Sequence, residues 1–108
     1  MSAVAIARPT IDFDVVNRAA LGVLPVLLDR WLPGGRRAGR EYVALNPCRA
    51  DRTLGSFKVN LSTGRWADFA TGDRGGDVIS LAAYLFDLPQ GEAARLIASM
   101  LGINEEAN

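Results

Sequence analysis

Hydrophobic and polar residues recur along the chain with two different periods. Between residues 11 and 33, and again between residues 77 and 103, apolar residues recur every three or four positions, as on one face of a helix. In the middle they alternate with polar residues, most clearly in SFKVNL, where Phe57, Val59 and Leu61 share one side. The pattern predicts an α+β fold in the order α-α-β-β-β-α-α, with helices flanking a small antiparallel sheet.

Capping residues mark the ends of the predicted helices. Asp12 or Asp14 can cap the first helix, and Pro25 suits the first turn of the second, where a missing N–H does no harm. Asp77 is a good N-cap for the third helix, and Gly102 a good stop for the last. The helical stripes are expected to be buried, and they comprise Val15, Val16, Ala19, Ala20, Val23, Leu24, Leu27, Leu28, Trp31, Val78, Leu81, Ala82, Leu85, Ala93, Leu96, Ile97, Met100 and Leu101.

The sheet is predicted from three short segments. Residues 41–46, 56–61 and 65–69 are expected to be strands, and Gly64 suits the turn between the last two. Residues 36–40, RRAGR, are expected to be a basic loop. The sheet should bury one face against the helices, with a predicted core of Val43, Leu45, Phe57, Val59, Leu81, Leu85 and Leu96.

Length and composition predict a single cytoplasmic domain. The chain has 108 residues, of which 49% are hydrophobic, enough for a modest core. Residues 11–103 are expected to form this domain, residues 1–10 a flexible arm and residues 104–108 a frayed tail. No run of 18 apolar residues occurs, and no basic segment precedes the short apolar run at the start, so neither a membrane span nor a signal peptide is predicted.

Residue usage argues against an enzyme. The chain has one cysteine, Cys48, and no histidine, so it lacks the commonest general base and cannot form an internal disulfide. No carboxylate cluster or acid-rich catalytic motif is present in the sequence. We therefore expect a binding module with no catalytic residue and no cofactor.

Charge is unevenly distributed, although the formal net charge is zero. Residues 30–74 carry nine basic and four acidic side chains, a local charge of +5. Residues 75–108 carry one basic and five acidic side chains, a local charge of −4. This is either an ordinary mixed surface or a basic middle segment that binds nucleic acid between acidic helices.

Four residues have the spacing of a metal site without its ligands. Asn46 and Arg49 are separated by two residues, as are Asp68 and Thr71, and eighteen residues lie between the pairs. A zinc ribbon is spaced in this way, but it uses Cys and His. Asn, Arg and Thr do not hold structural zinc, and arginine repels a cation, so no metal is expected.

The segment from Gly39 to Ile103 contains GREYVALNPCR, TLGSFKVN, TGRWADFAT, GGDVISLAAYL and GEAARLIASMLGI, in this order. With these motifs it resembles the zinc-binding domain at the front of bacterial and phage DNA primases. That family has the pattern G-x-Y-x-x-L-C-P-x-H, T-x-S-F-x-V, a hairpin, C-x-x-C, G-G-D before an apolar helix, and E-A-x-x-x-L, in the same order. The chain departs from this pattern by one extra residue between Gly39 and Tyr42, one between Thr53 and Ser56 and one before GGD, and its Leu96 comes one position early. All four zinc-ligand positions are also replaced: Asn46, Arg49, Asp68 and Thr71.

The resemblance implies a nucleic-acid-binding module of a primase or primase-helicase from a phage or other mobile element, without zinc. It implies single-stranded DNA template as the ligand, and a catalytic primase domain, helicase or other replication protein as partner. Such binding needs cations and flat aromatic faces. The candidates are Arg36, Arg37, Arg40, Arg52, Lys58, Arg65 and Arg74, with Trp66 and Tyr42 as stacking platforms unless they are core residues. The alternative is a protein-docking module that has lost nucleic-acid recognition along with zinc.

The four replaced positions suggest a substitute for the metal. In the fold that the resemblance implies, Arg49 and Asp68 face each other at the tips of two loops, where a guanidinium can bind a carboxylate with two hydrogen bonds. Asn46 and Thr71 can complete the hydrogen bonds. The other interpretation is that these are four unrelated surface residues.

Overall fold

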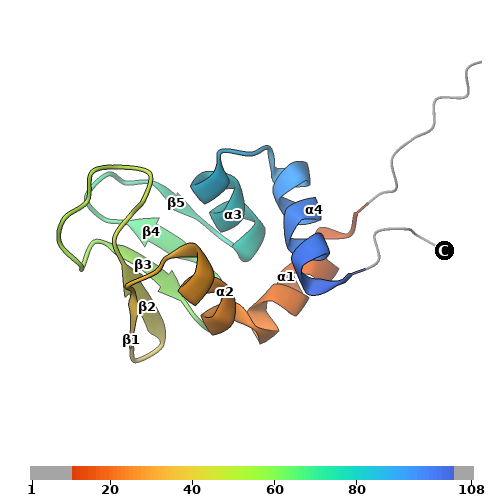
Figure 1. The fold of residues 1–108 in the computed structure, drawn as a ribbon, viewed down its shortest axis with the longest axis horizontal. Coiled ribbons are helices and arrows are strands. Elements are labelled where there is room, and N and C mark those ends of the chain that lie inside the picture. The colour runs from red at the N-terminus through yellow and green to blue at the C-terminus, as the bar shows by residue number, and fades with distance from the viewer. Residues whose placement is uncertain (1–10, 104–108) are drawn as a thin grey trace, which may run out of the picture.

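The computed structural model describes residues 11–103, so the predicted arm and tail lie outside the described residues. The fold is α+β, as predicted, with helices at both ends of the described chain and an antiparallel sheet between them. Figure 1 shows the strands gathered on the left of the molecule, and α1, α3 and α4 packed together on the right.

Four helices form from the segments with helical periodicity. They are α1 (Phe13–Gly22), α2 (Leu24–Trp31), α3 (Val78–Phe86) and α4 (Gln90–Leu101). Asp12 caps α1 by accepting hydrogen bonds from the backbone N–H groups of Asp14 and Val15. Asp77 and Ser80 form a reciprocal capping box at the start of α3, and Gly102 ends α4 in a left-handed conformation.

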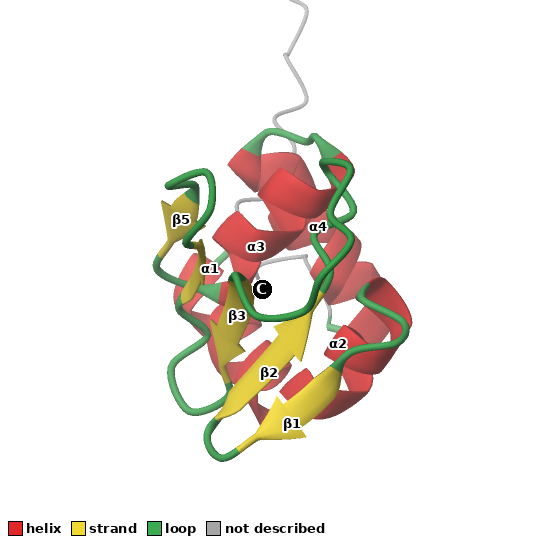
Figure 2. Cartoon of the chain, turned by 90° about the vertical axis from the view of Figure 1, so that its left-hand side faces the viewer, coloured by secondary structure: helices red, strands yellow, loops and turns green. Residues whose placement is uncertain are grey.

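Within residues 11–103, five strands, rather than three, form the sheet. They are β1 (Arg36–Ala38), β2 (Glu41–Ala44), β3 (Phe57–Asn60), β4 (Trp66–Asp68) and β5 (Arg74–Gly75). Their order in the sheet is their order in the chain, and every neighbouring pair is antiparallel. Figure 2 views the strands with helices behind them.

The prediction that residues 36–40 form a loop is wrong. Arg36, Arg37 and Ala38 pair with β2, and Gly39 makes the tight turn with a φ of 64°. This pairing supplies backbone hydrogen bonds, which cannot be predicted from the residue types in RRAGR. β5 is likewise formed by pairing, with Arg74 opposite Ala67.

One face of the sheet, here called the inner face, carries the side chains that pack against the helices. The register places Tyr42 opposite Val59 and Val59 opposite Trp66, so these three share that face, together with Ala44, Phe57 and Asp68. All six are buried, and the apolar members join one core with residues of all four helices. The opposite face, here called the outer face, carries Arg36, Glu41, Val43, Lys58, Asn60, Ala67 and Arg74.

The predicted core is correct in part. Val43, Phe57, Val59 and Leu81 are buried, whereas Leu85 and Leu96 are half-buried. Leu45 is 43% exposed, because Tyr42 and Ala44, not Val43 and Leu45, point from β2 toward the helices. Three residues of the predicted helical stripes are also exposed, at the ends or outer sides of their helices: Val15, Val23 and Met100.

Tyr42 is fixed between the sheet and α2. Its hydroxyl donates to Asp29 Oδ1 at 2.9 Å and lies 3.2 Å from the carbonyl of Leu32. Burial, together with the Asp29 carboxylate, raises the pKa of Tyr42 to about 12. A side chain at Gly35 would collide with the Tyr42 ring, so this close approach requires glycine.

Candidate nucleic-acid interface

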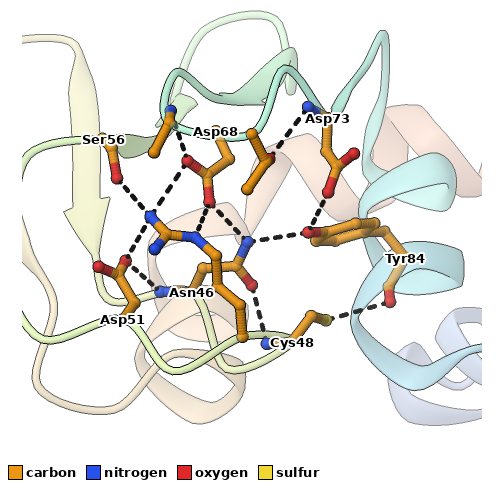
Figure 3. Close-up of polar contacts among 10 residues, drawn as sticks. Asn46, Cys48, Asp51, Ser56, Asp68, Asp73 and Tyr84 are labelled. Carbon is orange, nitrogen blue, oxygen red and sulfur yellow. Dashed lines mark hydrogen bonds and ion pairs between the residues drawn. The ribbon is translucent and has the colours of Figure 1, made fainter.

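Two loops meet at one end of the sheet and are joined by an ion pair. The loop between β2 and β3 carries Arg49, and Asp68 ends β4 where the loop to β5 begins. Arg49 Nε lies 2.7 Å from Asp68 Oδ2, and Arg49 Nη2 lies 3.3 Å from Asp68 Oδ1 (Figure 3). The predicted two-point contact between these side chains is therefore confirmed.

The buried carboxylate of Asp68 is stabilised by hydrogen-bond donors on each of its oxygens. Its carboxylate also accepts from Asn46 Nδ2 at 2.8 Å and from the backbone N–H of Ala70 at 2.9 Å. The Arg49 guanidinium, helped by these donors, holds the pKa of the Asp68 carboxyl well below its usual range. A buried charge of this kind is tolerated only with such complete hydrogen bonding.

The network extends from the ion pair in two directions. On one side Arg49 Nη2 donates to Ser56 Oγ at 2.8 Å and lies 3.3 Å from Asp51 Oδ2. On the other side Asn46 Nδ2 donates to the hydroxyl of Tyr84 at 2.8 Å, and that hydroxyl donates to Asp73 at 2.7 Å. Because Tyr84 belongs to α3, the network links both loops to a helix as well as to each other (Figure 3).

Thr71 does not complete the ion pair, contrary to the prediction. It is exposed, and its hydroxyl instead accepts from the backbone N–H of Asp73 at 3.2 Å. Tyr84, Ser56, Asp51 and Asp73 take part without having been predicted. The four-position spacing could not reveal them, since Tyr84 lies on another element and the rest lie within the loops and at their edge.

The described residues offer no cluster of acidic, cysteine or histidine side chains suited to a metal ion. Within residues 11–103, no three His, Cys, Asp or Glu side chains gather in this way. Cys48 is exposed, and its thiol lies 3.4 Å from the carbonyl oxygen of Tyr84. Partial burial and the nearby carboxylates of Asp73 and Asp87 raise the pKa of the Cys48 thiol, which keeps it protonated.

Because the pKa of the Asp68 carboxyl is lowered, the folded protein is expected to lose stability in acid. Its folded-state pKa is lowered, whereas an unfolded Asp titrates near pH 3.9. The stabilisation is therefore complete above about pH 5 and declines as the pH falls toward about 2, because the unfolded chain binds the proton first. The free energy of unfolding, measured with urea and plotted against pH across this range, should fall less steeply in Asp68→Asn than in the native chain. Equal slopes in the two proteins would contradict the assignment of this acid sensitivity to Asp68.

Cations line up across the outer face of the sheet. The register places Arg36 opposite Val43, Val43 opposite Lys58, Lys58 opposite Ala67 and Ala67 opposite Arg74. Directly opposed residues of antiparallel strands point to the same side. Three of the predicted cations therefore form one row across five strands.

An open groove of about 600 Å³ lies on this face. The polar and charged residues lining it are Glu41, Lys58, Asn60, Arg65 and Arg74, and glycines 75 and 76 form part of its wall. Phe69 also lines the groove and is 71% exposed, with the Lys58 ammonium 5.8 Å from its ring centroid. The groove thus combines positive charge with one accessible aromatic face.

The remaining predicted cations do not all join this groove. Arg65 does, directly after the turn that precedes β4. Arg37 is exposed but stands opposite Tyr42 in the register, in the row that belongs to the inner face. Arg40 lies in the turn between β1 and β2, and Arg52 in the loop between β2 and β3.

The predicted stacking platforms are core residues. Trp66 is among the residues that line the groove, but only 5% of it is exposed. Its ring packs against Tyr84, and its Nε1 donates to Ser80 Oγ at 2.9 Å. Tyr42 is 2% exposed. The prediction missed Phe69, although alternation along RWADF carries the signal: if Trp66 points inward, Phe69 points outward.

The chain matches no protein-family model, and no curated protein is significantly similar to it. Within residues 11–103, no helix is both long and apolar enough to cross a membrane.

Proposed function

We propose that this chain is a single-stranded DNA-binding module that engages its ligand through the outer face of the sheet. The observation that carries the proposal is the groove that Lys58, Arg65 and Arg74 line together with the exposed Phe69 ring. Cations along a groove track the phosphate backbone, and an aromatic face stacks on an unpaired base. These are the two elements that binding to single strands requires.

An exposed phenylalanine favours a single strand over a duplex. Phe69 presents its ring to solvent, and a base can stack on it only when that base is free of a complementary strand. The ammonium of Lys58 beside the ring places a phosphate-binding charge within reach of the same nucleotide.

The replication setting rests on the resemblance to the primase zinc-binding domain. We propose that the chain serves a phage or mobile-element primase or primase-helicase in the cytoplasm, and that the Arg49–Asp68 network takes over the mechanical role of the metal. The network supports this proposal because it joins the two loops that carry the replaced ligand positions. A catalytic primase domain or a helicase is the expected partner.

Titration of labelled oligonucleotides tests the proposal. The chain should bind single-stranded DNA with micromolar or weaker affinity, as expected for largely electrostatic contact, and more weakly at about 200 mM than at about 50 mM salt. Duplex of the same sequence should bind less tightly. A folded protein that shows no binding at the lower salt concentration would overturn the proposal.

Replacing Phe69 by Ala should weaken binding to single strands by about tenfold, near the low end of the 1–3 kcal/mol that stacking on one base contributes. Folding should be unaffected because the ring is exposed. Val26→Ala, which trims an exposed residue of α2, is the matched control and should bind as the native chain does. If the two variants bind single-stranded DNA with equal affinity, Phe69 is not part of the interface.

Docking to another replication protein is the alternative function. It is favoured by exposed apolar side chains on the last two helices, namely Phe86 and Met100, which are 40% and 43% exposed. Scattered exposed apolar residues are common on protein surfaces, so this observation is weaker than the basic groove. The titration separates the two functions, since a docking module would not bind the oligonucleotides.

A further inference from the structure

We infer that the groove also selects among bases, favouring those that carry an exocyclic amino group, and that Glu41 is the residue responsible. This inference rests on the proposed function, because it concerns the ligand of the same groove. It starts from an anomaly of charge: among the described residues that line the groove, Glu41 is the only carboxylate, in a surface otherwise built to attract phosphate.

The ion pair with Lys58 does not account for Glu41. The Lys58 ammonium is 3.9 Å from Glu41 Oε1, at the outer limit for such a pair, and the two side chains are 35% and 43% exposed. Exposed pairs of this kind contribute little to stability. The carboxylate therefore retains accessible acceptor sites that face the groove.

Asn60 stands beside Glu41 and presents the complementary group. The two residues are directly opposed across β2 and β3, and both line the groove. Asn60 Oδ1 accepts from the backbone N–H groups of Ser62 at 2.8 Å and Thr63 at 3.0 Å, which fixes the orientation of the amide. The Asn60 NH₂ group is thereby left as a donor, on the residue directly opposite Glu41.

This pair matches the edge of cytosine better than that of uracil or thymine. Cytosine offers its N4 amino group as a donor and N3 as an acceptor, and a glutamate accepting from N4 is an established mode of base recognition. Uracil and thymine offer only N3–H as a donor, flanked on both sides by carbonyl oxygens. A carboxylate approaching N3–H must therefore face a carbonyl oxygen, which repels it.

Two homo-oligonucleotides of equal length, one of deoxycytidine and one of deoxyuridine, test the inference. The bases are alike in size, and neither has a methyl group at C5. The native chain should bind the deoxycytidine strand about fivefold more tightly, at the low end of what one good base contact provides. In Glu41→Gln the ratio of the two affinities should fall to about one, because glutamine offers both a donor and an acceptor.

The ratio separates base selection from net charge. Glu41→Gln removes a negative charge and should strengthen binding of both strands, but this effect cancels in the ratio. Asp87→Asn is the matched control: Asp87 caps the C-terminal end of α3 with a φ of 54°, a conformation that Asn accepts, and it does not line the groove. This variant should retain the fivefold ratio.

Each outcome decides a different question. Binding of neither strand by the native chain would overturn the proposed function and the inference together. Binding of both strands with equal affinity, or a ratio that survives in Glu41→Gln, would overturn the inference and leave the proposed function standing.

Discussion

Replacing Asp68 by Asn is expected to lower the free energy of unfolding by about 3 kcal/mol, a large part of the stability of a small domain. The two carboxylate oxygens accept from four donors: Arg49 Nε, Arg49 Nη2, Asn46 Nδ2 and the Ala70 N–H. An amide in either orientation turns its own donors toward two of these. The Arg49 guanidinium keeps Asp51 as a partner, which places the loss at the low end for a broken buried pair.

Asp73→Asn is the control, since it removes a charge from the same loop while keeping an acceptor for the Tyr84 hydroxyl. It should change stability by less than about 0.5 kcal/mol. Denaturant unfolding followed by circular dichroism measures both. A second test combines Asp68→Asn with Arg49→Gln, which should together cost less than the sum of the single variants. Strict additivity, or Asp68→Asn no worse than the control, would mean that the ion pair does not hold the loops.

Removing two groove cations, in Arg65→Ala/Arg74→Ala, is expected to weaken binding of single-stranded DNA by about 50-fold at about 50 mM salt. Each lost phosphate contact reduces the slope of log affinity against log salt by about 0.7 for a single strand, so the pair should flatten it by about 1.4. Both residues are exposed, and the fold should be unchanged.

Arg18→Ala/Arg30→Ala removes the same charge from exposed positions on α1 and α2. This control should leave the salt slope near that of the native chain. If the two double variants lose affinity equally, the chain responds to net charge alone and the groove is not the interface. The RRAGR segment should contribute less than the groove, since Arg37 stands in the inner-face row and Arg40 in a turn.

Elements with strong local signals could be predicted from sequence. Asp77 and Gly102 mark helix ends by hydrogen bonding and by a left-handed backbone, both of which are properties of a few adjacent residues. β1 and β5 could not be predicted, because each exists through pairing with a neighbouring strand. The polarity of Arg36, Arg37 and Arg74 suggests a loop where the sheet in fact continues.

The buried face of a strand was harder to predict from the sequence than the ends of the helices. Trp66 and Tyr42 have side chains suited equally to a core and to a stacking platform, and only the register places both beside Val59 on the inner face. Phe69 lies just past the end of β4, and its exposure follows from the inward position of Trp66. A single error about which face of a strand is buried therefore interchanges the core residue and the binding residue.

The candidate site shows the same limit. The resemblance to the primase zinc-binding domain was enough to predict the contact between Arg49 and Asp68, because the fold it implies places them on two facing loops. Tyr84 could not be found in this way, since its hydroxyl reaches the loops from a helix that the spacing does not include.

Because the strands follow one another in chain order, each hairpin closes only a short segment, and the sheet can assemble rapidly from local contacts. The Asn46–Tyr84 hydrogen bond spans 38 residues and needs both the sheet and α3 in place. We therefore expect the polar network to form after the rate-limiting step of folding. In that case it governs how long the native state persists, and Asp68→Asn should unfold faster while folding at nearly the native rate.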